Sequence, residues 1–214
     1  MPMVTLHWDN YFHQELIVDA FRANLVCLTS TDTVLGLATS LSYQGFVQLN
    51  KIKQRSNKPY LILIGDLNEA LTFSHKESSA LIQKLGQACW PGPLTIIAKP
   101  NPLIPNFLLS YEETIALRVP HHKGLLEILQ QIPALFSTSA NEAGKPIPHS
   151  IAHVQTSILS QLNYSIVDTH ILPSQILSIV PSTIVDVTKG NAHLVRLGSY
   201  TKQELEQRTG IEFY

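Results

Sequence analysis

Short apolar runs alternate along the chain with segments in which apolar residues recur every three or four positions. The runs are rich in strand-forming residues and end in polar turn residues, so they predict buried strands. These strands are expected at 24–29, 60–64, 95–98, 114–119 and 134–137. The helical spacing predicts helices at 43–53, 77–88, 125–129 and 151–162. Strands that alternate with helices indicate an α/β fold with a sheet of mixed direction and flanking helices.

The pattern changes toward the end of the chain. Short strands follow one another near 165–168, 182–187 and 193–197, and their short connections favour some antiparallel pairs. A helix should follow them, because Thr201 stands three residues before Glu204, the spacing of a capping box. The sequence has no internal repeat and no Gly/Ser-rich linker. We therefore expect a single domain that ends in a helical tail.

Composition narrows the class of protein. The 214 residues are 44% apolar and 14% charged, with a net charge of −1. Since an average soluble domain is about 25% charged, this composition favours a sizeable core and argues against disorder. Fifteen Lys and Arg residues balance sixteen Asp and Glu residues. The chain therefore lacks the global basic field of a protein that coats duplex DNA, although a local basic patch is compatible with this balance.

The expected compartment follows from the cysteines and the apolar runs. Cys27 and Cys89 are too few for a disulfide framework or a four-ligand zinc site, so we expect buried thiols in a reducing compartment. The first residues lack a basic stretch followed by an apolar run, so no secretory signal is expected. No apolar stretch approaches the roughly 20 residues of a membrane span. These features predict a soluble, cytoplasmic protein with no membrane contact.

Familiar motifs for nucleotide binding, hydrolysis and metal binding are absent. The sequence has no G-x-x-x-x-G-K-[ST] loop, no G-x-G-x-x-G fingerprint and no G-x-S-x-G elbow. His149 and His153 have the i, i+4 spacing of metal ligands on a helix, but without a neighbouring carboxylate they are more typical of a solvated helix face. The His121–His122 pair is expected in a loop. We predict no protein-bound metal.

Two polar clusters follow predicted strands. Ser30-Thr31-Asp32-Thr33 comes directly after the first strand, where open α/β sheets place ligand contacts. A structural Ser/Thr turn is the alternative interpretation. Phe136-Ser-Thr-Ser-Ala-Asn141, followed by Gly144, ends another strand in small polar groups that let a ligand approach the backbone. Both clusters are candidate binding loops.

Cations provide a second kind of signal. Four of them lie within eight residues of a chain that is otherwise poor in charge: Lys51, Lys53, Arg55 and Lys58. An extended segment would place Lys53 and Arg55 on one side, where the pair suits a polyphosphate, although a helix dipole also favours cations at its C-terminus. Arg118 and Arg196 lie in apolar strand patterns and therefore require a carboxylate or a phosphate, either on a ligand or in a structural ion pair.

Seven segments occur in order along the chain: STDTVLGLA, KIKQRSNKP, WPGPLT, IALRVPHH, STSANEAGKP, STIVDVT and VRLGSYT. Together they resemble the YrdC-like family, whose best-known members are threonylcarbamoyl-AMP synthases. The resemblance covers residues 9–200, which are expected to form the catalytic domain, with a short helical tail at 201–214. The chain resembles the short bacterial form, so the extra C-terminal domain of longer relatives is not expected.

The resemblance implies a twisted open sheet around a concave, positively lined cavity. It also implies a nucleotidyltransferase that joins L-threonine, bicarbonate and ATP into threonylcarbamoyl-AMP and releases pyrophosphate. ATP would be a substrate, accompanied by Mg²⁺. A threonylcarbamoyl transferase complex would then complete the modification of tRNA, and tRNA itself is a candidate partner.

Family positions can be transferred to this chain one residue at a time. Lys53 and Arg55 match a K-x-R motif whose cations sit on the ATP phosphates, and they are the catalytic candidates. The other nucleotide contacts implied by the resemblance are Thr114, Asn141 and Arg196. The implied L-threonine contacts are Thr31, Arg118, Ser139 and Ser182. Either His149 or Ser150 matches a last nucleotide contact.

The chain departs from the family at a few positions. Ser30 stands where the family usually has Pro, and Ser56 and Lys58 replace the residues that usually follow the K-x-R motif. Two other functions stay open: a non-catalytic RNA-binding member of the family, and a carbamoyl-transfer domain like that of hydrogenase maturation factors. The balanced charge counts against RNA binding, which depends on clustered cations. The low cysteine count argues against the second alternative.

Overall fold

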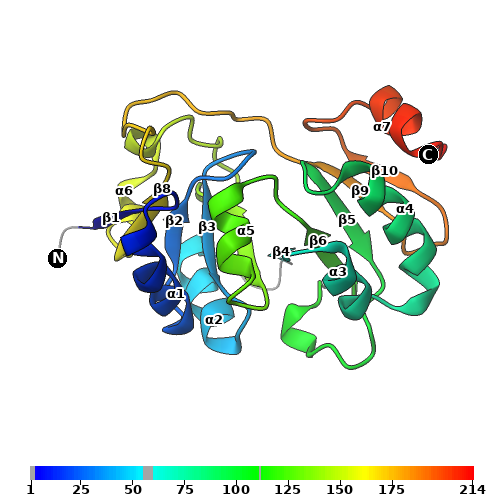
Figure 1. The fold of residues 1–214 in the computed structure, drawn as a ribbon, viewed down its shortest axis with the longest axis horizontal. Coiled ribbons are helices and arrows are strands. Elements are labelled where there is room, and N and C mark those ends of the chain that lie inside the picture. Colours follow the sequence, from blue (N-terminus) through cyan, green and yellow to red (C-terminus); the bar gives the residue numbers. More distant parts are fainter. Residues whose placement is uncertain (1–2, 55–59, 111) are drawn as a thin grey trace. The chain divides into compact units, whose positions relative to one another are not determined.

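The computed structural model describes residues 3–54, 60–110 and 112–214. The chain forms two compact units, and each combines segments from different parts of the sequence. Unit 1 contains residues 1–56 and 122–179, and unit 2 contains residues 57–121 and 180–214. Both units consist of strands with helices beside them (Figure 1).

The strands of unit 1 are hydrogen-bonded in the order β1-β8-β2-β3-β7. Their bounds are Val4–His7 for β1, Tyr164–Val167 for β8, Cys27–Thr29 for β2, Gly36–Ser40 for β3 and Leu135–Ser139 for β7. β8 pairs in parallel with both β1 and β2, whereas β3 pairs antiparallel with β2 and β7. The sheet of unit 1 is therefore mixed.

Helices flank the strands of unit 1 (Figure 1). They are α1 Gln14–Arg22, α2 Tyr43–Lys53, α5 Lys123–Leu129 and α6 Thr156–Leu159, with 3₁₀ turns η1 Tyr11–His13 and η4 Ile151–His153. α2 begins after Ser42, whose Oγ accepts a hydrogen bond from the Gly45 N–H at 2.9 Å. A cap of this kind stabilises a helix by about 1 kcal/mol. The helix ends where Gln54 adopts a left-handed φ of 48°.

The strands of unit 2 follow the order β4-β6-β5-β9-β10. Their bounds are Leu61–Leu63 for β4, Ile115–Arg118 for β6, Leu94–Ala98 for β5, Thr183–Asp186 for β9 and His193–Arg196 for β10. β4 is parallel to β6 and β5 is parallel to β9, while the β5–β6 and β9–β10 pairs are antiparallel. This unit also has a mixed sheet.

The helices of unit 2 are α3 Leu67–Phe73, α4 Ser79–Cys89 and α7 Lys202–Thr209, with 3₁₀ turns η2 Lys76–Ser78 and η3 Asn106–Leu108. α4 packs against α3 and α7. The capping box predicted at the start of α7 is present: Glu204 N–H donates to Thr201 Oγ1 at 3.2 Å, and Thr201 N–H donates to Glu204 Oε2 at 2.7 Å.

The predicted α/β class with a mixed, open sheet and flanking helices is confirmed, and α2 has the predicted bounds. The positively lined cavity that the resemblance implies stays a prediction. The single helix expected over 151–162 is wrong, because the segment forms η4 and α6 separated by Val154 and Gln155. Val154 is buried with an extended backbone (φ −69°, ψ 133°), so successive turns rather than one helix bury the apolar residues. Among the described residues, no helix has the length and apolar character to cross a membrane.

The two thiols are buried, as predicted. Cys27 in β2 is fully inaccessible to solvent, and Cys89 at the end of α4 is 3% exposed. Burial disfavours the thiolate and raises the pKa of Cys27 to about 12 and that of Cys89 to about 11. The thiolate is the form that reacts with alkylating reagents.

We therefore expect neither cysteine of the native protein to react with iodoacetamide at pH 8, whereas the protein unfolded in urea should take up a label at both. The same pKa shifts should lower stability as the pH rises above about 8.5, because only the unfolded chain can then ionise its thiols freely. Mass spectrometry of alkylated samples and urea melts at pH 8 and pH 10 check both statements. Rapid labelling of the native protein would contradict the first.

Candidate active site

In unit 1, predicted site residues converge where β7 ends. Lys53 is the last residue of α2 and is only 3% exposed. Its Nζ donates to the backbone oxygen of Ser139 at 2.8 Å, to the backbone oxygen of Asn141, and to Asn141 Oδ1 at 3.4 Å. A buried ammonium needs such partners, because desolvation of an unpaired charge is costly. The structure therefore fixes a cation beside the Ser139–Asn141 turn.

The Asn141 side chain shapes the same turn. Ser139 Oγ donates to Asn141 Oδ1 at 2.5 Å, and Asn141 Nδ2 donates to the backbone oxygen of Lys145. These bonds hold together the polar segment that follows β7. Lys53, Ser139 and Asn141, which the sequence singled out separately, form one hydrogen-bonded cluster.

Thr31 lies in the neighbouring loop of unit 1. Its Oγ1 donates to the Val34 backbone oxygen at 2.9 Å and accepts from the Thr33 N–H at 3.2 Å, so the loop contains the local turn that the sequence suggested as an alternative to a ligand site. The loop is also tied to the β7 end, because the Ala140 N–H donates to the Leu35 backbone oxygen at 2.9 Å. Residues 30–35 line a cavity of about 80 Å³ together with Ile171, Leu177 and Ser178.

In unit 2, Ser182 and Arg196 are linked to each other. Ser182 is buried, its Oγ lies 2.8 Å from Thr95 Oγ1, and its backbone oxygen accepts a hydrogen bond from Arg196 Nη2 at 2.8 Å. Desolvation lowers the pKa of the Arg196 guanidinium, although the ordinary value is so high that the group stays charged. Thr95 is a residue that the sequence analysis did not single out, since a hydroxyl within an apolar strand is an ordinary feature.

Arg118 lies at the same end of the unit 2 sheet. It is the last residue of β6, is 3% exposed, and donates from Nε to the Gly92 backbone oxygen at 3.1 Å. Ile96 lies opposite Leu117 in the antiparallel β5–β6 pair, so Thr95 and Arg118 are at one end of these strands. Leu94 lies beside Thr183 in the β5–β9 pair, which places Ser182 at that end too.

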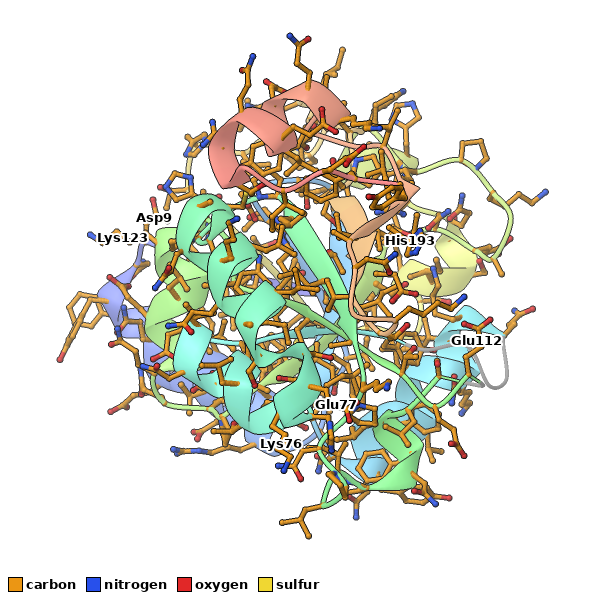
Figure 2. The ribbon with its side chains drawn as sticks, turned by 90° about the vertical axis from the view of Figure 1, so that its right-hand side faces the viewer. Asp9, Lys76, Glu77, Glu112, Lys123 and His193 are labelled. Atoms are coloured by element: carbon orange, nitrogen blue, oxygen red, sulfur yellow. The ribbon has the colours of Figure 1, made fainter. Side chains whose placement is uncertain are left out.

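Thr114 lies at the opposite end of β6 and does not join this group. Its Oγ1 is 2.8 Å from Ser110 Oγ, and the residue lines an open depression of about 1040 Å³ in unit 2. Glu77 and Glu112, labelled in Figure 2, also line this depression. Lys99 lines it as well and forms an ion pair of 3.0 Å with Glu77. The depression thus carries charges of both signs.

The remaining predicted residues lie outside the described part of the chain or apart from these clusters. Arg55, Ser56 and Lys58 lie outside the described residues. His149 and His153 are both exposed, as predicted, but they do not share a helix face, because His149 precedes η4 and His153 ends it. Their rings are in contact at 3.9 Å between centroids, and the buried Ser150 Oγ lies 2.7 Å from His153 Nδ1. The described residues contain no group of three or more His, Cys, Asp or Glu side chains that could hold a metal ion.

Gly198 packs closely against the backbone of Pro181 and Ser182. A Cβ atom at Gly198 would lie 2.2 Å from the Pro181 oxygen and 2.5 Å from the Ser182 carbonyl carbon, and both are backbone atoms. The G198A variant must therefore displace Ser182. We expect a loss of about 2 kcal/mol in the free energy of unfolding, which is typical of overpacking, and weaker binding of any ligand that contacts Ser182.

Urea denaturation of G198A measures this loss. The matched control is S199A, which removes the hydrogen bond from Ser199 Oγ to the Pro181 oxygen at 3.3 Å without adding an atom. Because Ser199 is exposed, S199A should stay within about 0.5 kcal/mol of the unchanged protein. Equal stability of G198A and S199A would show that the backbone can move aside at no cost.

Comparison with known proteins gives a consistent result. The model of a family described as Telomere recombination, which covers the Sua5, YciO and YrdC proteins, matches residues 19–198. The threonylcarbamoyl-AMP synthase of Pyrococcus abyssi is 29% identical over 183 residues, which are 84% of this chain and 52% of that protein. The threonylcarbamoyl-AMP synthase of Pseudomonas syringae pv. tomato is 32% identical over 143 residues, which are 66% of this chain and 77% of that protein. The chain spans about half the length of the first relative and more of the second.

A solved structure has the same fold. The crystal structure of P. abyssi Sua5 complexed with L-threonine matches with a TM-score of 0.82 and 23% sequence identity. The match covers 100% of this chain and 63% of that chain. At this level of identity, the likeness describes the fold alone.

Proposed function

The chain belongs to the Sua5/YciO/YrdC family, and on that premise we propose that it is an L-threonylcarbamoyladenylate synthase. The amine of L-threonine and bicarbonate give a carbamate with loss of water. A carbamate oxygen then attacks the α-phosphorus of ATP, and the bond to the β-phosphate breaks as pyrophosphate leaves. No covalent enzyme intermediate is needed, so the task of the protein is to position its substrates and to offset charge.

The observation that carries this proposal is the buried ammonium of Lys53 beside the Ser139–Asn141 turn. Negative charge grows on the leaving pyrophosphate, and a preorganised cation in a site that excludes water offsets it far better than one in solvent. Lys53 is 3% exposed and is held by backbone oxygens. Arg55 is proposed as its partner on the phosphates, and Arg196 as a further nucleotide contact.

A buried guanidinium and several hydroxyls are proposed to bind threonine. Arg118 is proposed to receive the substrate carboxylate, since a guanidinium can bind a carboxylate through two parallel hydrogen bonds. Thr31, Ser139 and Ser182 are proposed to meet the amine and the hydroxyl. A site that hydrogen-bonds the threonine hydroxyl rejects valine strongly, because its polar groups would be left unpaired.

The remaining partners follow from the chemistry. Mg²⁺ is proposed to accompany the ATP phosphates rather than to be held by protein carboxylates. The mixed anhydride is a reactive product, so a threonylcarbamoyl transferase complex is proposed to consume it in the modification of tRNA, in the cytoplasm. Thr114 and Asn141 are proposed as nucleotide contacts.

The test is pyrophosphate release from ATP by the purified protein, with bicarbonate and L-threonine supplied separately and together. We expect release only when both are present, and little release when valine or serine replaces threonine. Release without threonine would indicate a different ATPase. No release from a folded protein, together with salt-dependent binding of RNA, would favour the RNA-binding alternative.

A further inference from the structure

One carboxylate oxygen in unit 1 accepts hydrogen bonds from two side chains that are distant in the sequence. Asp168 directly follows β8, and its Oδ2 lies 3.1 Å from Ser30 Oγ and 3.1 Å from His122 Nε2. The His122 and Asp168 side chains are only 11% and 21% exposed. The sequence analysis did not single out Asp168, because a lone aspartate after a strand is typical of a turn.

The surrounding contacts direct both donors toward Asp168. Ser30 Oγ accepts a hydrogen bond from the buried Trp8 Nε1 at 3.2 Å, which leaves the hydroxyl hydrogen for Asp168. His122 caps α5, since its Nδ1 accepts from the Leu125 N–H at 3.2 Å. The proton of a neutral imidazole must then be on Nε2, which donates to Asp168. The three side chains Ser30, Asp168 and His122 are called the clamp below.

The clamp adjoins the cavity that Thr31 lines, because Ser30 belongs both to the clamp and to the lining. Ser30 begins the 30–35 loop, which supplies one part of the lining. Asp168 begins the segment that supplies the rest, namely Ile171, Leu177 and Ser178. The Ser30 N–H also donates to the Ile166 oxygen at 3.0 Å, so the two parts of the lining are joined where they leave β2 and β8. When the clamp is broken, the two parts of the lining lose this side-chain link and keep only their backbone connection between β2 and β8.

We infer that Asp168 is a positioning residue for L-threonine: through Ser30 it fixes the distance between Thr31 and the 171–178 side of the cavity. This inference rests on the proposed function. Ser30 stands where the resembling family usually has proline, which has no hydroxyl to donate. Proline at this position would leave Asp168 without the hydroxyl donor that Ser30 supplies. Asp168 acts on binding of threonine, not on the reacting atoms.

The test compares the KM for threonine with kcat and with the KM for ATP in the pyrophosphate assay. D168A removes the acceptor and should raise the KM for threonine about tenfold, which corresponds to about 1.4 kcal/mol. The value of kcat and the KM for ATP should stay within about twofold, since no charged contact to the nucleotide is lost. D168N keeps an oxygen that can accept both hydrogen bonds and should restore the KM for threonine to within about threefold.

Two further variants separate positioning from general destabilisation. D9N alters a different carboxylate: Asp9 accepts a hydrogen bond at 3.0 Å from the N–H of Thr169, the residue after Asp168. Because Asp9 is not part of the cavity lining, D9N should leave the KM for threonine unchanged. H122N keeps an oxygen to cap α5 but loses the link to Asp168, and it should raise the KM for threonine in the same direction as D168A. If D168A does not fold, S30A provides the same comparison.

The outcomes are distinct. A tenfold rise confined to the KM for threonine, with rescue by D168N, supports the clamp. An unchanged KM for threonine in D168A overturns the inference while the proposed function stands, and so does a parallel loss in kcat and both KM values. Absence of threonine-dependent release by the unchanged protein contradicts the proposed function, and the inference about threonine falls with it.

Discussion

Replacing Lys53 with methionine is expected to lower threonine-dependent pyrophosphate release about a thousandfold, the effect of removing a preorganised charge-stabilising donor. Methionine keeps an unbranched apolar stem but has no cation to offset the charge on pyrophosphate. Of the hydrogen bonds from Lys53 Nζ to Ser139 and Asn141 at the end of β7, the one to Asn141 Oδ1 is the longest at 3.4 Å. That donor is the one most easily redirected to a phosphate oxygen. The loss should therefore appear in kcat and in the KM for ATP.

The same substitution also has a structural cost, which must be measured separately. K53M leaves two backbone oxygens without their donor, which lowers the free energy of unfolding by about 1–3 kcal/mol. Lys51 offers a matched control, because it is exposed on the same helix two positions earlier. K51M should retain activity within about twofold. Activity of K53M within a factor of ten of the unchanged protein would remove Lys53 from the catalytic machinery.

The second large effect is expected at Arg118. The R118A variant should raise the KM for threonine about a hundredfold, equivalent to about 2.8 kcal/mol, because the substrate carboxylate would enter a buried site without its cation. R118K keeps the charge but not the planar fork, and the hydrogen bond from Nε to the Gly92 oxygen is lost as well. Its KM should lie between those of R118A and the unchanged protein. The pyrophosphate assay with threonine varied at saturating ATP measures both.

An exposed arginine in the same unit provides the control for Arg118. Arg208 in α7 stacks over the Tyr200 ring at 5.1 Å and is exposed to solvent. R208A should leave the KM for threonine within about twofold. If R118A also bound threonine normally, the carboxylate must be recognised by another cation.

Local signals explain which elements could be predicted from the sequence. α2 has the helical spacing of apolar residues and a capping serine, and α7 has a capping box. The start of each helix can therefore be predicted from the sequence. α1 buries Ile17, Val18 and Phe21 but has no side-chain cap, so the sequence carries no signal for where this helix begins. β3 begins with glycine and ends in threonine and serine, a composition typical of a loop. Its pairing on both sides with β2 and β7 decides its structure, and this pairing depends on residues far away in the sequence.

In the candidate site, too, single residues can be predicted from local sequence signals, whereas contacts between distant residues cannot. Polar clusters after predicted strands were enough to single out Thr31 and Asn141, and a basic run in a chain that is poor in charge singled out Lys53. The partners of those residues could not be read from the pattern: Lys53 meets Ser139 across 86 positions, and Ser30 meets Asp168 across 138. Such contacts depend on strand order. In unit 1 that order places β8 beside β2, although 134 positions separate Tyr164 of β8 from Ser30 at the end of β2.

Each unit combines an early and a later segment of the chain, so during synthesis on the ribosome some early strands must wait for their partners. β1 and β2 are both made early, yet each pairs with β8, which is completed only at Val167. Until β8 has left the exit tunnel, the early strands have unpaired backbone edges that can associate with other nascent chains. The N-terminal half of the chain is therefore expected to need protection by a holding chaperone, and expression at lower temperature should raise the soluble yield.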